Sequence, residues 1–211
     1  MQSDNIEVNI KFKMKDLQVN TVQFSAVSWD KSGNALWSKM IYSVLENENN
    51  EFIDGTYLPT DINLFCPRFN ILNREQKMNF WGQFLASVSF EESSWKPTAQ
   101  YIETTQGIDP MTGLQSKSEG LLQLSYKDQQ SYRIDCGFDW STDKQLRETD
   151  ARKTIFDPYQ NLRCGIKILS YQLKNYKSIV TKNGNQYWQV LKPSEKLEKI
   201  KKSTLSLPFC N

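Results

Sequence analysis

The sequence predicts a mainly α-helical α+β domain with one small β element and an N-terminal extension. Two long segments carry apolar residues at helical spacings of three and four, and turn-rich polar segments separate them. At 211 residues the chain is long enough for one well-packed domain. It has no internal repeat and no linker that would require two domains. We therefore expect residues 1–65 to form an extension packed on a main domain of residues 66–211.

The N-terminal part changes from an alternating pattern to a helical one. Its first apolar residues are separated by polar ones, which predicts a short strand or an extended arm at Ile6, Val8, Ile10 and Phe12. Residues 35–46 predict a short helix because Leu36, Met40, Ile41 and Val44 lie at helical spacing. The polar run over residues 46–55 then predicts a loop.

The strongest helical pattern covers residues 73–94. Asn73 is a suitable N-cap, and one apolar stripe follows it at Met78, Trp81, Leu85 and Val88. The same spacing leads on to Glu92 and Trp95, so we expect Glu92 to be buried at the C-terminal end of this helix. Burial and the negative end of the helix dipole both disfavour an ionised carboxylate, so the pKa of Glu92 should be raised. Glu91, about 100° around the helix, has no such reason to be buried.

The remaining segments alternate between loops and helices. Residues 98–112 predict loops or a short β-hairpin, residues 118–125 a compact apolar turn that leads into a helix, and residues 132–153 a charged loop. Residues 157–174 predict an amphipathic helix that begins at Asp157-Pro158. We expect a short helix at residues 187–191 and a Lys/Glu-rich helix near residues 194–202.

The composition excludes several classes of function. The 26 basic and 24 acidic residues nearly cancel, whereas a nucleic-acid binder normally carries a basic stripe. The absence of histidine excludes Ser-His-Asp and Cys-His catalysis and histidine-based metal sites. Carboxylates are therefore the leading candidates for hydrolytic chemistry, and we expect no metal and no cofactor. No segment is apolar enough to span a membrane.

The four cysteines indicate an oxidising compartment. They are widely spaced and contain no C-x-x-C pair, which favours two disulfides over zinc or redox use, although four free thiols in a cytosolic protein are the alternative. Three connectivities are possible. Our preferred pairing is Cys66–Cys210 with Cys136–Cys164, since the first closes a very long loop and so constrains the unfolded chain. We expect a secreted or periplasmic protein whose signal peptide has been removed, because the start lacks the apolar core of such a peptide.

Three short motifs stand out in the sequence. They are residues 92–97 (ESSWKP), residues 120–124 (GLLQL), and residues 157–162 (DPYQNL) followed by Gly165. In order and spacing they resemble the Glu-Ser-x-aromatic-x-Pro, Gly-Leu-Met-Gln-Ile and Asp-Pro-x-x-Asn-Ile-x-x-Gly motifs of the soluble lytic transglycosylase and goose-type lysozyme families of the lysozyme superfamily. The resemblance covers about residues 80–191, leaves residues 1–65 uncovered, and implies a lysozyme-like catalytic domain in residues 66–211.

The resemblance implies a role for each matching residue. Glu92 takes the place of the catalytic acid, Ser93 and Ser118 become candidates for hydrogen bonds near the sugar, and Gln123 becomes a cleft residue that contacts substrate. The family has an Ala-Tyr-Asn motif whose Tyr lies close to the catalytic Glu. The nearest equivalent is Gln186-Tyr187-Trp188. Tyr187 therefore takes that role without the family's Asn.

A second carboxylate decides between hydrolysis and transglycosylation. The resemblance implies that a lytic transglycosylase needs only Glu92, because the acetamido group of the substrate assists and a 1,6-anhydro sugar forms. An inverting hydrolase needs a second carboxylate to activate water. The resemblance to goose-type lysozymes implies an acidic residue after the catalytic helix, where Glu103 lies, eleven residues past Glu92. We favour a hydrolase with Glu103 in that role and Asp109 as the alternative.

Acidity around the predicted cleft points to a particular substrate. The residues expected there are Glu91, Glu92, Glu103, Asp109 and Glu119. Such a cleft favours a sugar with a free amine, and a deacetylated sugar offers no acetyl group to assist. The chain is also similar to lysozymes of predatory bacteria that act on deacetylated peptidoglycan.

We therefore expect a monomeric muramidase-type enzyme that cleaves β-1,4 bonds in peptidoglycan. The alternatives are a lytic transglycosylase, a chitinase-like enzyme, and a non-catalytic wall-binding module or inhibitor. The intact Glu92 disfavours the last of these.

Overall fold

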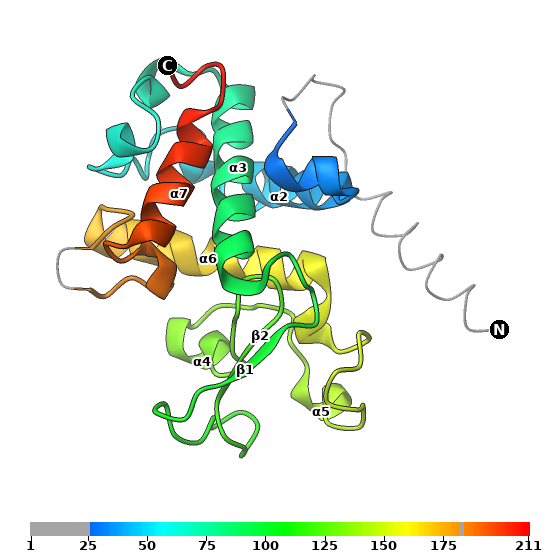
Figure 1. The fold of residues 1–211 in the computed structure, drawn as a ribbon. Helices are drawn as coiled ribbons and strands as arrows, with labels where there is room; N and C mark the ends of the chain where they lie inside the picture. Colours follow the sequence, from blue (N-terminus) through cyan, green and yellow to red (C-terminus); the bar gives the residue numbers. More distant parts are fainter. Residues whose placement is uncertain (1–25, 182–183) are drawn as a thin grey trace.

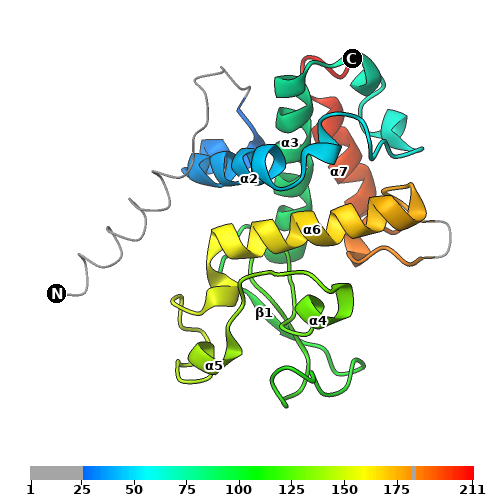
Figure 2. The ribbon, with the colours of Figure 1, turned by 180° about the vertical axis from the view of Figure 1, so that it is seen from behind.

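The long helix α3 (Arg74–Ser93) forms the centre of the molecule. The computed structural model describes residues 26–181 and 184–211, so the alternating segment predicted at residues 6–12 lies outside the described residues. Helix α7 (Glu195–Leu205) runs alongside α3, and α2 (Ala35–Asn47) and α6 (Pro158–Tyr176) cross it (Figures 1 and 2). A lobe with a small β-sheet lies at the C-terminal end of α3 (Figure 1).

Helix α3 begins where its sequence predicts. The side chain of Asn73 accepts a hydrogen bond from the backbone N–H of Gln76, and the Gln76 side chain accepts one from the N–H of Asn73, which forms a capping box. The prediction of a single apolar stripe was wrong, because every residue from Met78 to Ser89 is buried. Neighbouring elements enclose the helix on all sides, so even its polar residues lie in the interior.

The other long helices match their predicted bounds closely. Helix α2 ends one residue beyond the prediction, and α6 starts after an Asp157 N-cap whose side chain accepts from the N–H of Gln160. Ser194 caps α7 in the same way. The helix predicted at residues 187–191 is only a single 3₁₀ turn, η6 (Gln189–Leu191).

Residues 26–65 share one hydrophobic core with the rest of the protein. Helix α2 packs against both α3 and α6. The 3₁₀ turns η1 (Ser28–Ser32), η2 (Asn50–Phe52) and η4 (Phe69–Ile71) each supply a buried ring, and η3 (Ile62–Leu64) supplies the buried side chain of Ile62. Phe52 and Phe69 pack edge-on against Trp81 of α3, with ring centroids 4.9 and 5.9 Å from that of the tryptophan.

The β element is an antiparallel pair, β1 (Gln100–Ile102) and β2 (Lys117–Glu119). Gln100 pairs with Glu119, and Tyr101 pairs with Ser118. The second strand overlaps the start of the segment predicted as a compact apolar turn, residues 118–125, so the hairpin is longer than expected. The lobe is completed by α4 (Asp128–Tyr132), α5 (Trp140–Asp143) and η5 (Thr154–Phe156), of which α5 lies in the predicted charged loop.

Two disulfides join distant parts of the chain. They are Cys66–Cys210 and Cys136–Cys164, the pairing preferred from the sequence. In the described part of the chain, no helix has the length and apolarity needed to cross a lipid bilayer. The overall architecture is therefore the mainly helical one with a small β element that the sequence predicts.

Candidate active site

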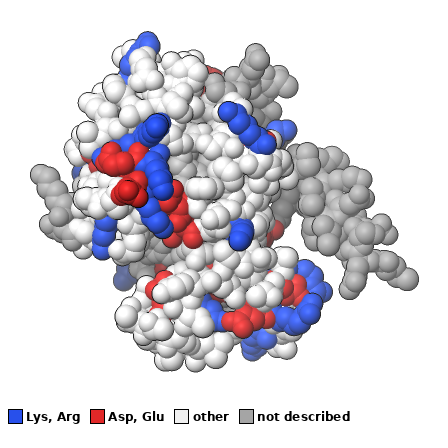
Figure 3. All heavy atoms as spheres, in the orientation of Figure 1, with Lys and Arg blue, Asp and Glu red and all other residues white. Residues whose placement is uncertain are grey.

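A cleft of about 730 Å³ lies between the helical body and the hairpin lobe. The C-terminal end of α3, the hairpin, α4, the segment before η6 and the start of α7 contribute to its walls. In Figure 3, acidic side chains border the hollow between these two parts of the molecule. The residues that matter for the chemistry below are Glu91, Glu92, Tyr101, Glu103, Ser118, Gln123, Lys127, Asp128, Tyr132, Tyr187 and Lys196.

Glu92 occupies the last turn of α3 and is half-buried. The pKa of its carboxyl is raised to about 7, chiefly by burial and to a smaller extent by the nearby Glu103 and Glu91 carboxylates. The Lys196 ammonium and a hydrogen bond from the backbone N–H of Val190 act in the opposite direction. A carboxyl group with this pKa is partly protonated at neutral pH, as a general acid must be.

Glu103 comes directly after β1 on the opposite wall of the cleft. Its backbone N–H donates to the Ser116 carbonyl at 2.9 Å, which extends the hairpin pairing. Its carboxylate accepts a hydrogen bond from the Ser118 hydroxyl at 2.5 Å. Glu103, Ser118 and Glu92 all line the cleft, so two carboxylates face one substrate-sized space.

The turn at Gly120–Leu124 is held by the helix that carries the third motif. Gly120 has φ 81°, and a Cβ at this position would lie 2.2 Å from the Asn161 side-chain nitrogen. The Asn161 amide accepts from the N–H of Leu122 and donates to the carbonyls of Glu119 and Ile155. The second and third motifs are therefore one structural unit.

Gln123 ends this turn with φ 50° and reaches the cleft. Its side-chain N–H₂ donates to the carbonyls of Gly120 and Ala99, at 2.9 and 3.2 Å. These bonds fix the orientation of the amide, so its oxygen is the polar atom available to a ligand.

Ser93 is not among the residues that line the cleft. It is buried, and its hydroxyl lies 2.9 Å from the carbonyl oxygens of both Ser89 and Leu121. This hydroxyl ties the end of α3 to the Gly120–Leu124 turn. The resemblance implied that Ser93 contacts the sugar, whereas in the structure its hydroxyl makes hydrogen bonds inside the protein.

Tyr187 lines the cleft together with an aspartate that the sequence did not single out. The Tyr187 hydroxyl donates to the Asp128 carboxylate at 2.5 Å, and the N–H of Ser125 donates to the same carboxylate at 2.7 Å. Burial raises the pKa of Asp128 to about 6, while these two hydrogen bonds lower it. No local pattern marks Asp128, because its partner Tyr187 is 59 residues away along the chain.

Two of the five acidic residues expected around the cleft lie elsewhere. Asp109 is buried in the hairpin loop, where its carboxylate accepts from the N–H groups of Met111 and Lys127. Glu119 lies on the other face of β2, because neighbouring strand residues point to opposite faces. The cleft carboxylates are Glu91, Glu92, Glu103 and Asp128, accompanied by Lys127 and Lys196. Across residues 26–181 and 184–211, no group of three potential metal ligands occurs.

Comparisons with known proteins place the chain in a family. Residues 69–192 match the transglycosylase SLT domain, whereas no curated protein matches. The solved structure named "Bd0314 DslA wild-type form 2" is 28% identical, with a TM-score of 0.73 over 90% of this chain and 100% of that chain.

Structures of two Bd0314 DslA variants, each with one glutamate replaced by glutamine, are also similar. Both are 26% identical with the same coverage, and their TM-scores are 0.73 and 0.71. The two replaced glutamates lie eleven positions apart in that protein. These matches confirm the resemblance predicted from the three motifs. The chain belongs to the transglycosylase SLT domain family and is a peptidoglycan-cleaving, lysozyme-like protein.

Proposed function

We propose that this protein is a muramidase-type glycoside hydrolase that cleaves β-1,4 bonds in peptidoglycan glycan strands. The observation that carries the proposal is the pair of carboxylates, Glu92 and Glu103, that line one cleft in different environments. Enzymes that hydrolyse glycosides commonly use one protonated and one ionised carboxyl group, separated by environment.

In the proposed mechanism, Glu92 is the general acid. Its raised pKa keeps a proton available near neutral pH, and this proton passes to the glycosidic oxygen as the bond to the sugar breaks. Glu103 is the general base that takes a proton from the attacking water. The Ser118 hydroxyl holds its carboxylate in place. Each proton is accounted for without any group beyond this chain and water.

The spacing of the two glutamates supports the pair. Glu92 and Glu103 are eleven positions apart in this chain. The glutamates replaced in the two Bd0314 DslA variants have the same separation. This shared separation is what we expect if both proteins use two carboxylates at this spacing.

The charges of the cleft favour a sugar that carries an amine. Four carboxylates line it against two lysines, and of the four only Asp128 is fully buried and occupied by hydrogen bonds from Tyr187 and Ser125. A negatively charged cleft raises the local concentration of a cationic substrate. A deacetylated glucosamine is such a cation, and it has no acetyl group to assist bond cleavage. We therefore propose a preference for deacetylated peptidoglycan.

Other parts of the cleft have proposed binding roles. Ser118, Gln123 and Tyr187 provide polar atoms along its walls and are our candidates for substrate contacts.

We propose that residues 66–211 form the catalytic domain, that residues 1–65 are an extension packed on it, and that the protein is a monomer. The two disulfides and the peptidoglycan-acting family fit an extracellular or periplasmic protein.

Product analysis tests the hydrolase proposal. Purified glycan strands would be digested and the new ends identified by mass spectrometry. Reducing ends that incorporate ¹⁸O from labelled water support hydrolysis, whereas 1,6-anhydro ends identify a lytic transglycosylase, the activity for which the family is named. The same assay on chitin oligosaccharides tests a chitinase-like activity.

Chemical modification of the substrate tests the acetylation preference. Deacetylated walls and the same walls after chemical N-acetylation would be digested in parallel. We expect faster cleavage of the deacetylated form, and a larger difference at low salt, because the attraction is electrostatic. Equal rates on both forms would overturn the preference and leave the hydrolase proposal intact.

A further inference from the structure

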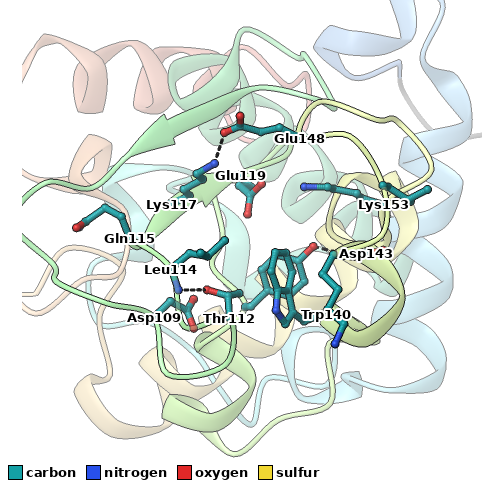
Figure 4. Close-up of a pocket in the computed structure, with 13 residues that line it drawn as sticks. Asp109, Thr112, Leu114, Gln115, Lys117, Glu119, Trp140, Asp143, Glu148 and Lys153 are labelled. Atoms are coloured by element: carbon teal, nitrogen blue, oxygen red, sulfur yellow. Dashed lines mark hydrogen bonds and ion pairs between the residues drawn. The ribbon is translucent and has the colours of Figure 1, made fainter.

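A second pocket, of about 270 Å³, lies on the other side of strand β2 from the cleft. Alternation along the strand separates the two, because Ser118 faces the cleft while its neighbours Lys117 and Glu119 line the second pocket. Trp140 and Lys153 form the opposite wall (Figure 4). The family resemblance and the proposed chemistry use none of these four residues.

Lys153 is the unusual group in this pocket. Its side chain is buried, with only 5% of the residue exposed, yet its ammonium makes no hydrogen bond or ion pair with any residue in the described ranges. It lies 5.9 Å from the Trp140 ring centroid and 5.8 Å from that of Phe156. These ring contacts leave the N–H groups of the ammonium available to a ligand. In Figure 4 this ammonium points into the pocket, where it can receive an anionic oxygen.

Several other charged groups of the pocket already have ion-pair or hydrogen-bond partners within the protein. Lys117 is paired with Glu148. The buried Asp143 accepts from the Tyr126 hydroxyl and from Thr154. Asp109 accepts from the N–H groups of Met111 and Lys127, and Lys144 is exposed to solvent. Glu119 and Lys153 are therefore the buried charged groups that a ligand can use.

Glu119 is one of these groups. It is 4% exposed, and one carboxylate oxygen accepts from the Gln100 amide at 2.7 Å. Its second oxygen accepts no hydrogen bond from the described residues. Lys153 acts electrostatically on the Glu119 carboxyl, so the two groups belong to one site. The pocket thus offers a cation, an acceptor oxygen and an apolar ring wall.

We propose that this pocket binds the carboxyl-terminal residue of a short peptide. The terminal carboxylate would lie on the Lys153 ammonium, the N–H of the same residue would donate to Glu119, and its side chain would pack against Trp140. A carboxylate next to a hydrogen-bond donor is the arrangement that matches the two free groups. The proposed function supplies a source for such peptides, the stems attached to the glycan strands, and only this assignment of source rests on it.

Binding of a defined dipeptide tests the proposal. The probe is D-alanyl-D-alanine, a peptide end of the kind found in bacterial walls, and its carboxamide removes the carboxylate charge. The readout is the NMR signal of the Trp140 indole N–H, assigned through Trp140→Phe. We expect a saturable shift with the dipeptide and roughly ten- to a hundredfold weaker binding of the carboxamide, since a hydrogen bond to a charged group is lost.

Lysine variants show whether Lys153 is responsible. Lys153→Met should weaken binding by roughly the same factor, and Lys153→Arg should restore most of it. Lys39→Met, at an exposed position on α2, is the matched control and should bind like the parent.

Several results would overturn the proposal. They are the absence of a Trp140 shift, equal affinity for the carboxamide, and unchanged binding by a folded Lys153→Met variant. If Lys153→Met does not fold, the carboxamide comparison on the parent protein still decides. The readout requires no glycan cleavage, so its failure is distinguishable from a failure of the proposed enzymatic function.

Discussion

The end of α3 and the hairpin hold the same kind of side chain in contrasting ways. Glu92 projects from a helix enclosed on all sides, and burial raises its pKa to about 7. Glu103 follows a three-residue strand, and one serine hydroxyl holds its carboxylate. The helical core sets the proton affinity of one carboxyl group, whereas a small lobe positions the other. These contrasting environments support the proposed roles of Glu92 as the acid and Glu103 as the base.

The largest expected effect is that of removing the proposed acid, Glu92. Glu92→Gln keeps the shape of the side chain but cannot donate a proton of comparable acidity, so kcat should fall by about 10³-fold or more. The measurement is the initial rate on defined glycan strands. Glu75→Gln, in the first turn of the same helix, is the matched control. Appreciable activity in Glu92→Gln would show that Glu92 is not the general acid.

Removing the proposed base should have the next largest effect. Glu103→Gln should lower the hydrolytic rate by about 10²-fold, because water activation is lost while the acid remains. Near-parental activity with 1,6-anhydro products would instead mean that Glu92 works alone.

Asn161→Ala tests the stability of the fold around the site and not the catalytic groups themselves. The Asn161 amide makes three hydrogen bonds in the interior, and their loss should lower the free energy of unfolding by about 2–4 kcal/mol. Urea denaturation measures this change. Asn175→Ala, exposed near the end of the same helix, should cost less than about 1 kcal/mol. A small effect at Asn161 would contradict its place as the link between the second and third motifs.

The raised pKa of Glu92 predicts a pH dependence with a definite sign. In the proposed mechanism the protonated carboxyl is the active form, so kcat/KM should fall about tenfold per pH unit once the pH exceeds about 7. Below the unfolded pKa the carboxyl is protonated in both the folded and the unfolded protein. As the pH rises toward 7, the unfolded state gains the ionised form more readily, and the folded protein loses relative stability.

The stability of a variant checks that sign independently of catalysis. Glu92→Gln should be more stable than the parent by about 1–2 kcal/mol at pH 8, after allowance for partial solvent exposure, and nearly equal to it at pH 4. Thermal unfolding at both pH values measures the difference. A Glu92→Gln variant less stable than the parent at pH 8 would show that its pKa is not raised.

The smallest expected effect comes from the contact that positions Glu103. Ser118→Ala removes one hydrogen bond to the carboxylate and should lower kcat by about three- to tenfold with little change in KM. Ser118→Thr keeps a hydroxyl and should restore part of the rate. A Ser118→Ala effect confined to KM would make Ser118 a substrate contact alone.

Local patterns explain which parts of the fold were predicted from the sequence. The N-caps Asn73 and Asp157 act on residues three positions away, and the helices that they begin were located correctly. The packing of α3 on all sides was missed, because it depends on elements far away in the sequence. The position of β2 was missed for the same reason, since a three-residue strand has too little pattern to reveal its partner.

The same distinction applies to the site. Glu92 was predicted from helix periodicity, and Glu103 was predicted from the resemblance to goose-type lysozymes. Asp128 was not predicted, because only the fold brings it to Tyr187. The expected positions of Asp109 and Glu119 were wrong for a related reason. A charge can be counted in the sequence, but the face of a strand or loop on which it lies depends on register.

The bond between Cys66 and Cys210 gives the protein an unusual covalent topology. With this bond, residues 66–210 form a closed ring that contains α3, both pockets, α6 and α7. A protease that cuts once inside this ring opens it but releases no fragment. In surroundings rich in proteases, a nicked molecule therefore remains one covalent body that can keep its cleft assembled. The nick would become visible on a gel only after reduction.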